Sequence, residues 1–109
     1  MADEELRVTL QLLRVLEAML DQPDGGHYGS ELSSATGLKS GTLYPILARL
    51  ERAGWATSAW EFNTPTELGR PRRRHYKLTG MGATAAERHL RQAPGRQGRL
   101  MARPVWGTV

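Results

Sequence analysis

The sequence predicts a mainly α-helical domain with one small β-hairpin, on three observations. Apolar residues recur at helical spacing along several segments. Two short alternating segments are separated by a stretch of turn residues, which is the pattern of a hairpin. The chain has 109 residues and no cysteine, so it forms a single modest core that depends on packing alone. We expect the domain to cover residues 1–93, and residues 94–109, with Trp106, to be a disordered basic tail.

The first helix is expected from about Glu4 to Asp21, because neither Gly nor Pro interrupts an apolar pattern with an acidic first turn. Its apolar residues cover an arc of roughly 220°, wider than a one-sided surface helix requires. We interpret the extra width, which includes Leu12, Val15 and Met19, as a surface buried against a second subunit. The alternative is a helix placed centrally in the core of its own small domain.

Two helices joined by a short turn are expected next, which is the arrangement of a helix-turn-helix. Gly37 is a C-terminal stop for the first of them, and Leu38-Lys39 forms the turn. The expected elements are a loop over 23–26, a very short strand at 27–28, a helix over 30–36, and a helix that Ser40 or Gly41 caps and Gly54 ends.

This second helix has two unlike faces. Its apolar stripe is formed by Leu43, Ile46, Leu47 and Leu50. The opposite face carries small residues, a hydroxyl and two guanidinium groups: Gly41, Thr42, Pro45, Ala48, Arg49 and Arg52. Pro45 costs little, because the carbonyl it would clash with belongs to Gly41 at the helix start. Such a face suits a DNA groove.

A hairpin and a last helix complete the domain. Residues 55–62 alternate as a strand, with Trp55 and Trp60 as large packing residues on different faces. Residues 63–71 form a loop, and residues 72–78 pair back as a second strand, so the hairpin has a basic tip. A weak helix from about Met81 to Gln92 follows, capped by Thr79. The whole is a winged helix-turn-helix.

The charge distribution favours a polyanionic partner. The formal net charge is +4, with acidic residues gathered in the first third and arginines in the last. The three histidines, His27, His75 and His89, are too scattered to predict a metal site, and no catalytic or cofactor motif is present. The N-terminus carries no basic leader and no stretch approaches the roughly 20 apolar residues that span a bilayer. We expect neither secretion nor membrane insertion, and a cytoplasmic location.

A set of motifs resembles the PadR family of bacterial transcriptional regulators over roughly residues 10–90. The motifs are Gly-Thr-Leu-Tyr-Pro at 41–45, Leu-Glu-x-x-Gly-Trp at 50–55, Gly-Arg-Pro-Arg-Arg at 69–73 and Tyr-Lys-Leu-Thr at 76–79. The resemblance implies a homodimeric winged-helix repressor of a palindromic operator that dimerises through its first and last helices, so Leu90 joins the candidate interface residues. Ser30 and Gly80 depart from the family pattern.

The resemblance and the two-faced helix together give the candidate DNA contacts. They are Lys39, Ser40, Thr42, Tyr44 and Arg49 on the helix, and Arg70, Arg72, Arg73 and Arg74 on the wing. Other roles stay open, since Ser40 can serve only as a cap, Tyr44 can simply pack, and Arg49 can pair with an acid. The alternative function is an interaction module whose basic wing docks an acidic partner. A small-molecule effector could bind near the interface residues of the first helix, although packing alone explains them.

Overall fold

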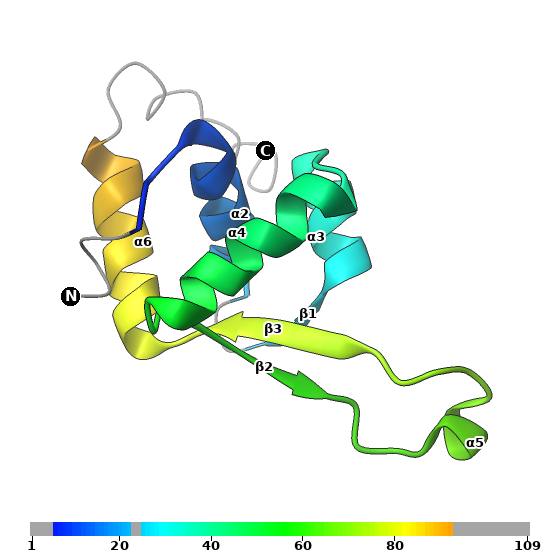
Figure 1. Cartoon of the computed structure of the whole chain (residues 1–109). Coiled ribbons are helices and arrows are strands. Elements are labelled where there is room, and N and C mark those ends of the chain that lie inside the picture. Colours follow the sequence, from blue (N-terminus) through cyan, green and yellow to red (C-terminus); the bar gives the residue numbers. More distant parts are fainter. Residues whose placement is uncertain (1–5, 23–24, 93–109) are drawn as a thin grey trace, which may run out of the picture.

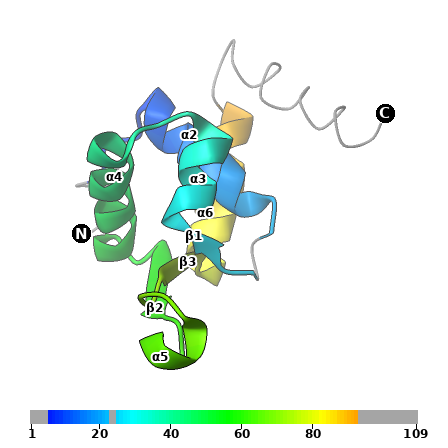
Figure 2. The same cartoon turned by 90° about the vertical axis from the view of Figure 1, so that its right-hand side faces the viewer.

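The fold is seen in a computed structural model that describes residues 6–22 and 25–92 (Figure 1). The helices gather into one body, and a hairpin extends beyond them with a short helix at its far end (Figures 1 and 2). The elements are α2 (Leu10–Leu20), β1 (His27–Tyr28), α3 (Gly29–Thr36), α4 (Ser40–Arg52), β2 (Ala56–Trp60), α5 (Pro65–Leu68), β3 (Arg74–Leu78) and α6 (Gly80–Gln92). This is the mainly helical winged helix-turn-helix that the sequence predicts.

Helix α2 begins later than the sequence predicts. Its first residue is Leu10, and the side chain of Thr9 caps it by accepting a hydrogen bond from the Leu12 amide at 3.1 Å. Residues 6–9 are not helical, and Glu4, where the helix was expected to begin, lies outside the described residues. The local capping hydroxyl outweighs the uninterrupted apolar pattern, because it satisfies an amide that has no partner within the helix.

The wide apolar arc of α2 belongs to the core of the chain's own domain. Leu12, Val15 and Met19 have no exposed surface, and Leu90 of α6 is only 5% exposed. The reason is that α2 packs against α3, α4, α6 and β3, so it is enclosed on several sides. These four side chains therefore have almost no surface left for a second subunit, which corrects their assignment to a dimer interface.

The turn between α3 and α4 is fixed by local hydrogen bonds. Gly37 ends α3 in the left-handed conformation, with φ of 79°, which favours glycine. The Ser33 hydroxyl donates to the Leu38 carbonyl at 2.7 Å, and the Leu38 amide donates to the Thr36 hydroxyl at 3.1 Å. Lys39 is the N-cap residue of α4, without a side-chain capping bond, and Ser40 is its first helical residue. Neither Ser40 nor Gly41 caps the helix as expected.

Three antiparallel strands form the sheet, in the order β1-β3-β2. Both hairpin strands are shorter than predicted, since β2 lacks residues 55, 61 and 62 and β3 lacks residues 72 and 73, although the Glu61 amide still donates to the Arg73 carbonyl at 2.9 Å. Within the predicted loop lies a short helix, α5, which the sequence analysis missed. Thr64 caps it in a reciprocal capping box with Glu67, and Pro65 fits its first turn because that position needs no amide donor.

Helix α6 lies close to the backbone before β2. An added Cβ at Gly82 would lie 1.9 Å from the Trp55 carbonyl oxygen, so glycine is required at this contact. The Thr79 hydroxyl accepts from the Gly82 amide at 2.9 Å, which confirms the predicted cap. Trp55 is 2% exposed and stacks at a tilt on His89, with ring centroids 5.6 Å apart. Among the described helices, none is long and apolar enough to cross a membrane.

Candidate nucleic-acid interface

Helix α4 presents the two faces that the sequence predicts. Leu43, Ile46, Leu47 and Leu50 are buried. A stripe at spacings of three or four residues lies opposite: Gly41, Pro45, Ala48 and Arg52. Gly41 leaves open space, since an added Cβ there would meet no atom within 4 Å. The helix runs through Pro45 without a break, as its place in the first turns allows.

None of the predicted contact residues of α4 belongs to this stripe, and they lie at the start of the helix and on the flanks of the stripe. Lys39 and Ser40 are exposed at the start of the helix, and Thr42 is partly buried on one flank. Tyr44 lies on the other flank, 44% exposed, with its ring 6.4 Å from that of Tyr76. Tyr44 therefore packs against the sheet and is also partly exposed, and its contact with DNA stays a prediction.

The two arginines of α4 differ in exposure. Arg49 is partly buried, and its Nε atom is buried without a hydrogen-bond partner in the described part of the chain. Arg52 is exposed and continues the outward stripe. The sequence analysis chose Arg49 as a DNA contact and omitted Arg52. The helical spacing from Gly41 could have found Arg52, because it places Arg52 farther from the core than Arg49.

Glu61, just after β2, organises the base of the wing. It accepts hydrogen bonds from the Arg70 guanidinium at 2.7 and 2.9 Å, from the Tyr28 hydroxyl at 2.8 Å and from the Arg73 amide at 2.9 Å. The Arg70 hydrogen bonds, with smaller contributions from Tyr28 and Arg73, lower the pKa of Glu61 to about 2. The same pair raises the pKa of Arg70. Arg70 is thus committed to fixing the wing.

The remaining wing arginines are exposed but also anchored. Arg72 donates from Nε to the Asn63 carbonyl at 2.9 Å. The guanidinium of Arg73 lies 5.6 Å from the Tyr28 ring centroid. Arg74 donates from Nε to the Ser58 hydroxyl at 2.8 Å. Because a guanidinium has five N–H donors, each of these three keeps donors available for an anion.

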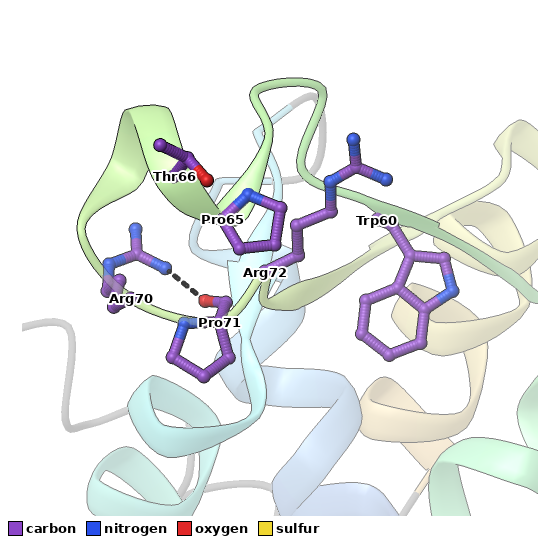
Figure 3. A pocket seen from close by; sticks show the side chains of 6 residues that line it. All are labelled: Trp60, Pro65, Thr66, Arg70, Pro71 and Arg72. Atoms are coloured by element: carbon purple, nitrogen blue, oxygen red, sulfur yellow. Dashed lines mark hydrogen bonds between the residues drawn. The ribbon is translucent and has the colours of Figure 1, made fainter.

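The register places the wing arginines on two sides of the hairpin. Trp60 pairs with Arg74, and the same side of the ladder carries Tyr76, which contacts α4 through Tyr44. Arg72 lines a surface hollow together with Trp60, so it lies on that side as well (Figure 3). Arg73, in contact with Tyr28, lies on the opposite side. The α4 side of the wing therefore carries Arg72 and Arg74.

Exposed aromatic residues on the wing are the feature that the sequence analysis missed. Trp60, expected to pack, is 57% exposed, and Phe62 is 93% exposed. The alternating pattern does not reveal this, because it assigns residues to faces without showing where the core ends. Within residues 6–22 and 25–92, no three His, Asp or Glu side chains are grouped so as to hold a metal ion.

Solved structures show that this fold is that of winged-helix transcriptional regulators. The chain is 21% identical to MarR from E. coli, with a TM-score of 0.66 over 92% of this chain and 69% of that one. It is 26% identical to a PadR-like transcription factor from Bacteroides fragilis (TM-score 0.58; 72% and 78% covered). It is 23% identical to the regulator PcaV from Streptomyces coelicolor, solved with its natural ligand (TM-score 0.64; 92% and 64% covered).

The sequence places the chain in one family within the winged-helix transcriptional regulators. Residues 15–88 match the model of the transcriptional regulator PadR-like family, and the chain belongs to this family. Its members are DNA-binding transcription factors rather than enzymes. A search of curated proteins finds no match.

Proposed function

We propose that the chain is a transcriptional repressor that binds, as a homodimer, an operator of two inverted half-sites. The observation that carries this is the position of the exposed stripe of α4 beside an arginine-rich hairpin. Glu51 of α4 links the two, since it accepts from the Ser58 hydroxyl at 2.6 Å and lies 3.9 Å from the Arg74 guanidinium. One surface can then contact bases with a helix and phosphates with a wing.

The start of α4 is the proposed reading surface. In a helix-turn-helix, the first residues of the second helix contact base edges in the major groove. Lys39, Ser40, Thr42 and Tyr44 lie there, with polar groups that can donate to bases or phosphates. Gly41 allows the groove to approach the backbone, because it adds no atom on the exposed side.

The wing supplies the proposed phosphate contacts through Arg72 and Arg74. Both lie on the α4 side of the hairpin and are exposed. If two wings and two recognition helices neutralise about 6 to 8 phosphates, log affinity falls against log salt concentration with a slope of roughly −5 to −7. Arg73 faces the other way, and Arg70 is held by Glu61, so neither is proposed as a principal contact.

Dimerisation is proposed through the outer surfaces of α2 and α6. Their inward residues are used by the core, but Leu10 of α2 is 42% exposed and Met81 of α6 is 52% exposed. A two-fold axis would place the two copies of α4 in successive major grooves, about 34 Å apart. The operator should then be an inverted repeat with half-sites about one helical turn apart. Such a repressor acts in the cytoplasm, with the bacterial chromosome.

The test is binding of the full chain to duplexes that it selects from a random pool, followed by footprinting. Thr42→Ala should change the preferred bases within a half-site, whereas Arg72→Ala should weaken binding to all sequences. Light scattering of the free protein reports the dimer. If no duplex is enriched or protected, the DNA-binding function is refuted, and a module that docks an acidic protein takes its place.

A further inference from the structure

The wing carries exposed apolar surface that its own fold does not use. Among the described residues, the large hydrophobic side chains with most exposure are Phe62 at 93% and Trp60 at 57%, and one residue separates them. Single exposed aromatics are common and need no explanation. Two of them on the extension that also carries the exposed arginines form a surface suited to a partner that is both apolar and anionic.

The backbone beneath these aromatics is anchored. Glu61, between them, receives the Arg70, Tyr28 and Arg73 hydrogen bonds described above. The residues after Glu61 are also held, because Arg72 donates to the carbonyl of Asn63 at 2.9 Å and to that of Phe62 at 3.5 Å. A side chain that extends from a fixed backbone can enter a partner with little loss of chain entropy.

A shallow hollow of about 730 Å³ borders Trp60 (Figure 3). Its lining is Trp60, Pro65, Thr66, Arg70, Pro71 and Arg72. The guanidinium of Arg74 lies 5.4 Å from the Trp60 ring centroid, so cations flank the indole. Three acids lie nearby: Glu61 and Glu51 are paired with Arg70 and Arg74, and Glu67 of α5 is engaged by Thr64 in the capping box. The four wing arginines outnumber these acids, so the surface still favours negative charge.

We propose that the wing bends DNA, with Phe62 entering the minor groove as a wedge between base pairs and Trp60 packing against the sugars. The proposal rests on the DNA-binding function above. The minor groove offers apolar sugar walls between two rows of phosphates, which matches aromatic rings flanked by Arg72 and Arg74. Apolar wedges of this kind unstack a base step and kink the duplex away from themselves.

The experiment measures bending and affinity together. A selected duplex of about 30 base pairs carries a fluorescence donor and acceptor at its two ends, and the full chain is titrated in. The wild type should raise energy transfer. Phe62→Ala should remove most of that rise and lower affinity roughly 5- to 30-fold, while Phe62→Leu should keep both. Because Phe62 is almost fully exposed, the thermal unfolding of both variants should match the wild type.

A second duplex separates a wedge from a merely favourable contact. A single-base bulge at the step nearest the wing unstacks that step in advance, so it should reduce the difference in affinity between wild type and Phe62→Ala. Equal bending and affinity in the two proteins, with footprints intact, would overturn the wedge and leave the DNA-binding function standing. A change in the molecular mass of free Phe62→Ala would assign the surface to contacts between copies, which also overturns it. Failure of the wild type to bind any duplex refutes the underlying function.

Discussion

Gly82→Ala tests the close approach of α6 to the residues before β2. The new Cβ would lie 1.9 Å from the Trp55 carbonyl oxygen, 2.7 Å from its carbonyl carbon and 2.8 Å from its Cα atom. Contacts of real Cβ atoms essentially never fall below 3.0 Å, so α6 has to move by about 1.1 Å. Backbone atoms cannot rotate aside as a flexible side chain can. The shift also disturbs the Thr79 amide, which donates to that same oxygen at 3.0 Å.

The expected loss of stability follows from two opposing terms. Overpacking of this kind costs about 1 to 3 kcal/mol, and a contact with backbone belongs at the upper end. Alanine in a helix interior returns about 1 kcal/mol relative to glycine. The net loss is therefore about 2 kcal/mol, which lowers the melting temperature of a domain of this size by roughly 8 to 16 °C.

Gly80→Ala is the matched control in the same helix. An added Cβ at Gly80 meets no atom within 4 Å, so this variant should keep or slightly raise the melting temperature. Both variants are compared with the wild type by circular dichroism at one protein concentration, because the transition of the proposed dimer would depend on concentration. A melting temperature for Gly82→Ala at or above that of the wild type would refute the backbone contact.

Three further predictions concern the wing and α4. Glu61 has a folded pKa of about 2, below its ordinary 4.5, so its stabilising contribution is complete above pH 4.5 and is lost as pH falls toward 2. Urea unfolding between pH 5 and 2 should therefore show a shallower decline for Glu61→Gln than for the wild type, and parallel declines would contradict this. Gly41→Leu should leave thermal stability unchanged or higher, since the site is open, yet lower DNA affinity about tenfold or more by blocking the groove, as anisotropy would show. Unchanged affinity would mean that the stripe of α4 does not face DNA. Arg72→Ala should reduce the magnitude of the slope of log affinity against log salt concentration by about 2 in a dimer. Arg73→Ala, at the neighbouring position on the other side of the hairpin, should change this slope less. Equal slopes for the two variants would refute this division of the wing.

The helix-turn-helix could be predicted closely because its signals are local. Gly37 ends α3 in a conformation that glycine favours, and the spacing of Leu43, Ile46 and Leu47 defines the buried side of α4 whatever it packs against. The predicted start of α2 was wrong, because an apolar pattern does not mark where a helix begins. Helix α5 was missed because a segment rich in Thr, Pro and Gly reads as a loop, although Thr64 and Glu67 have the spacing of a capping box.

The sequence by itself determined the order of the elements, the apolar side of α4 and the gathering of arginines on a hairpin, because periodicity, turn residues and charge act over a few neighbouring residues. Only the tertiary structure decided which partner each side chain has. It encloses Leu12, Val15 and Met19 within the core of the single chain and commits Arg70 to Glu61. It also leaves Phe62 in solvent. Burial and pairing depend on elements far apart in the chain, and a one-dimensional pattern shows that a residue is apolar or charged without showing what reaches it.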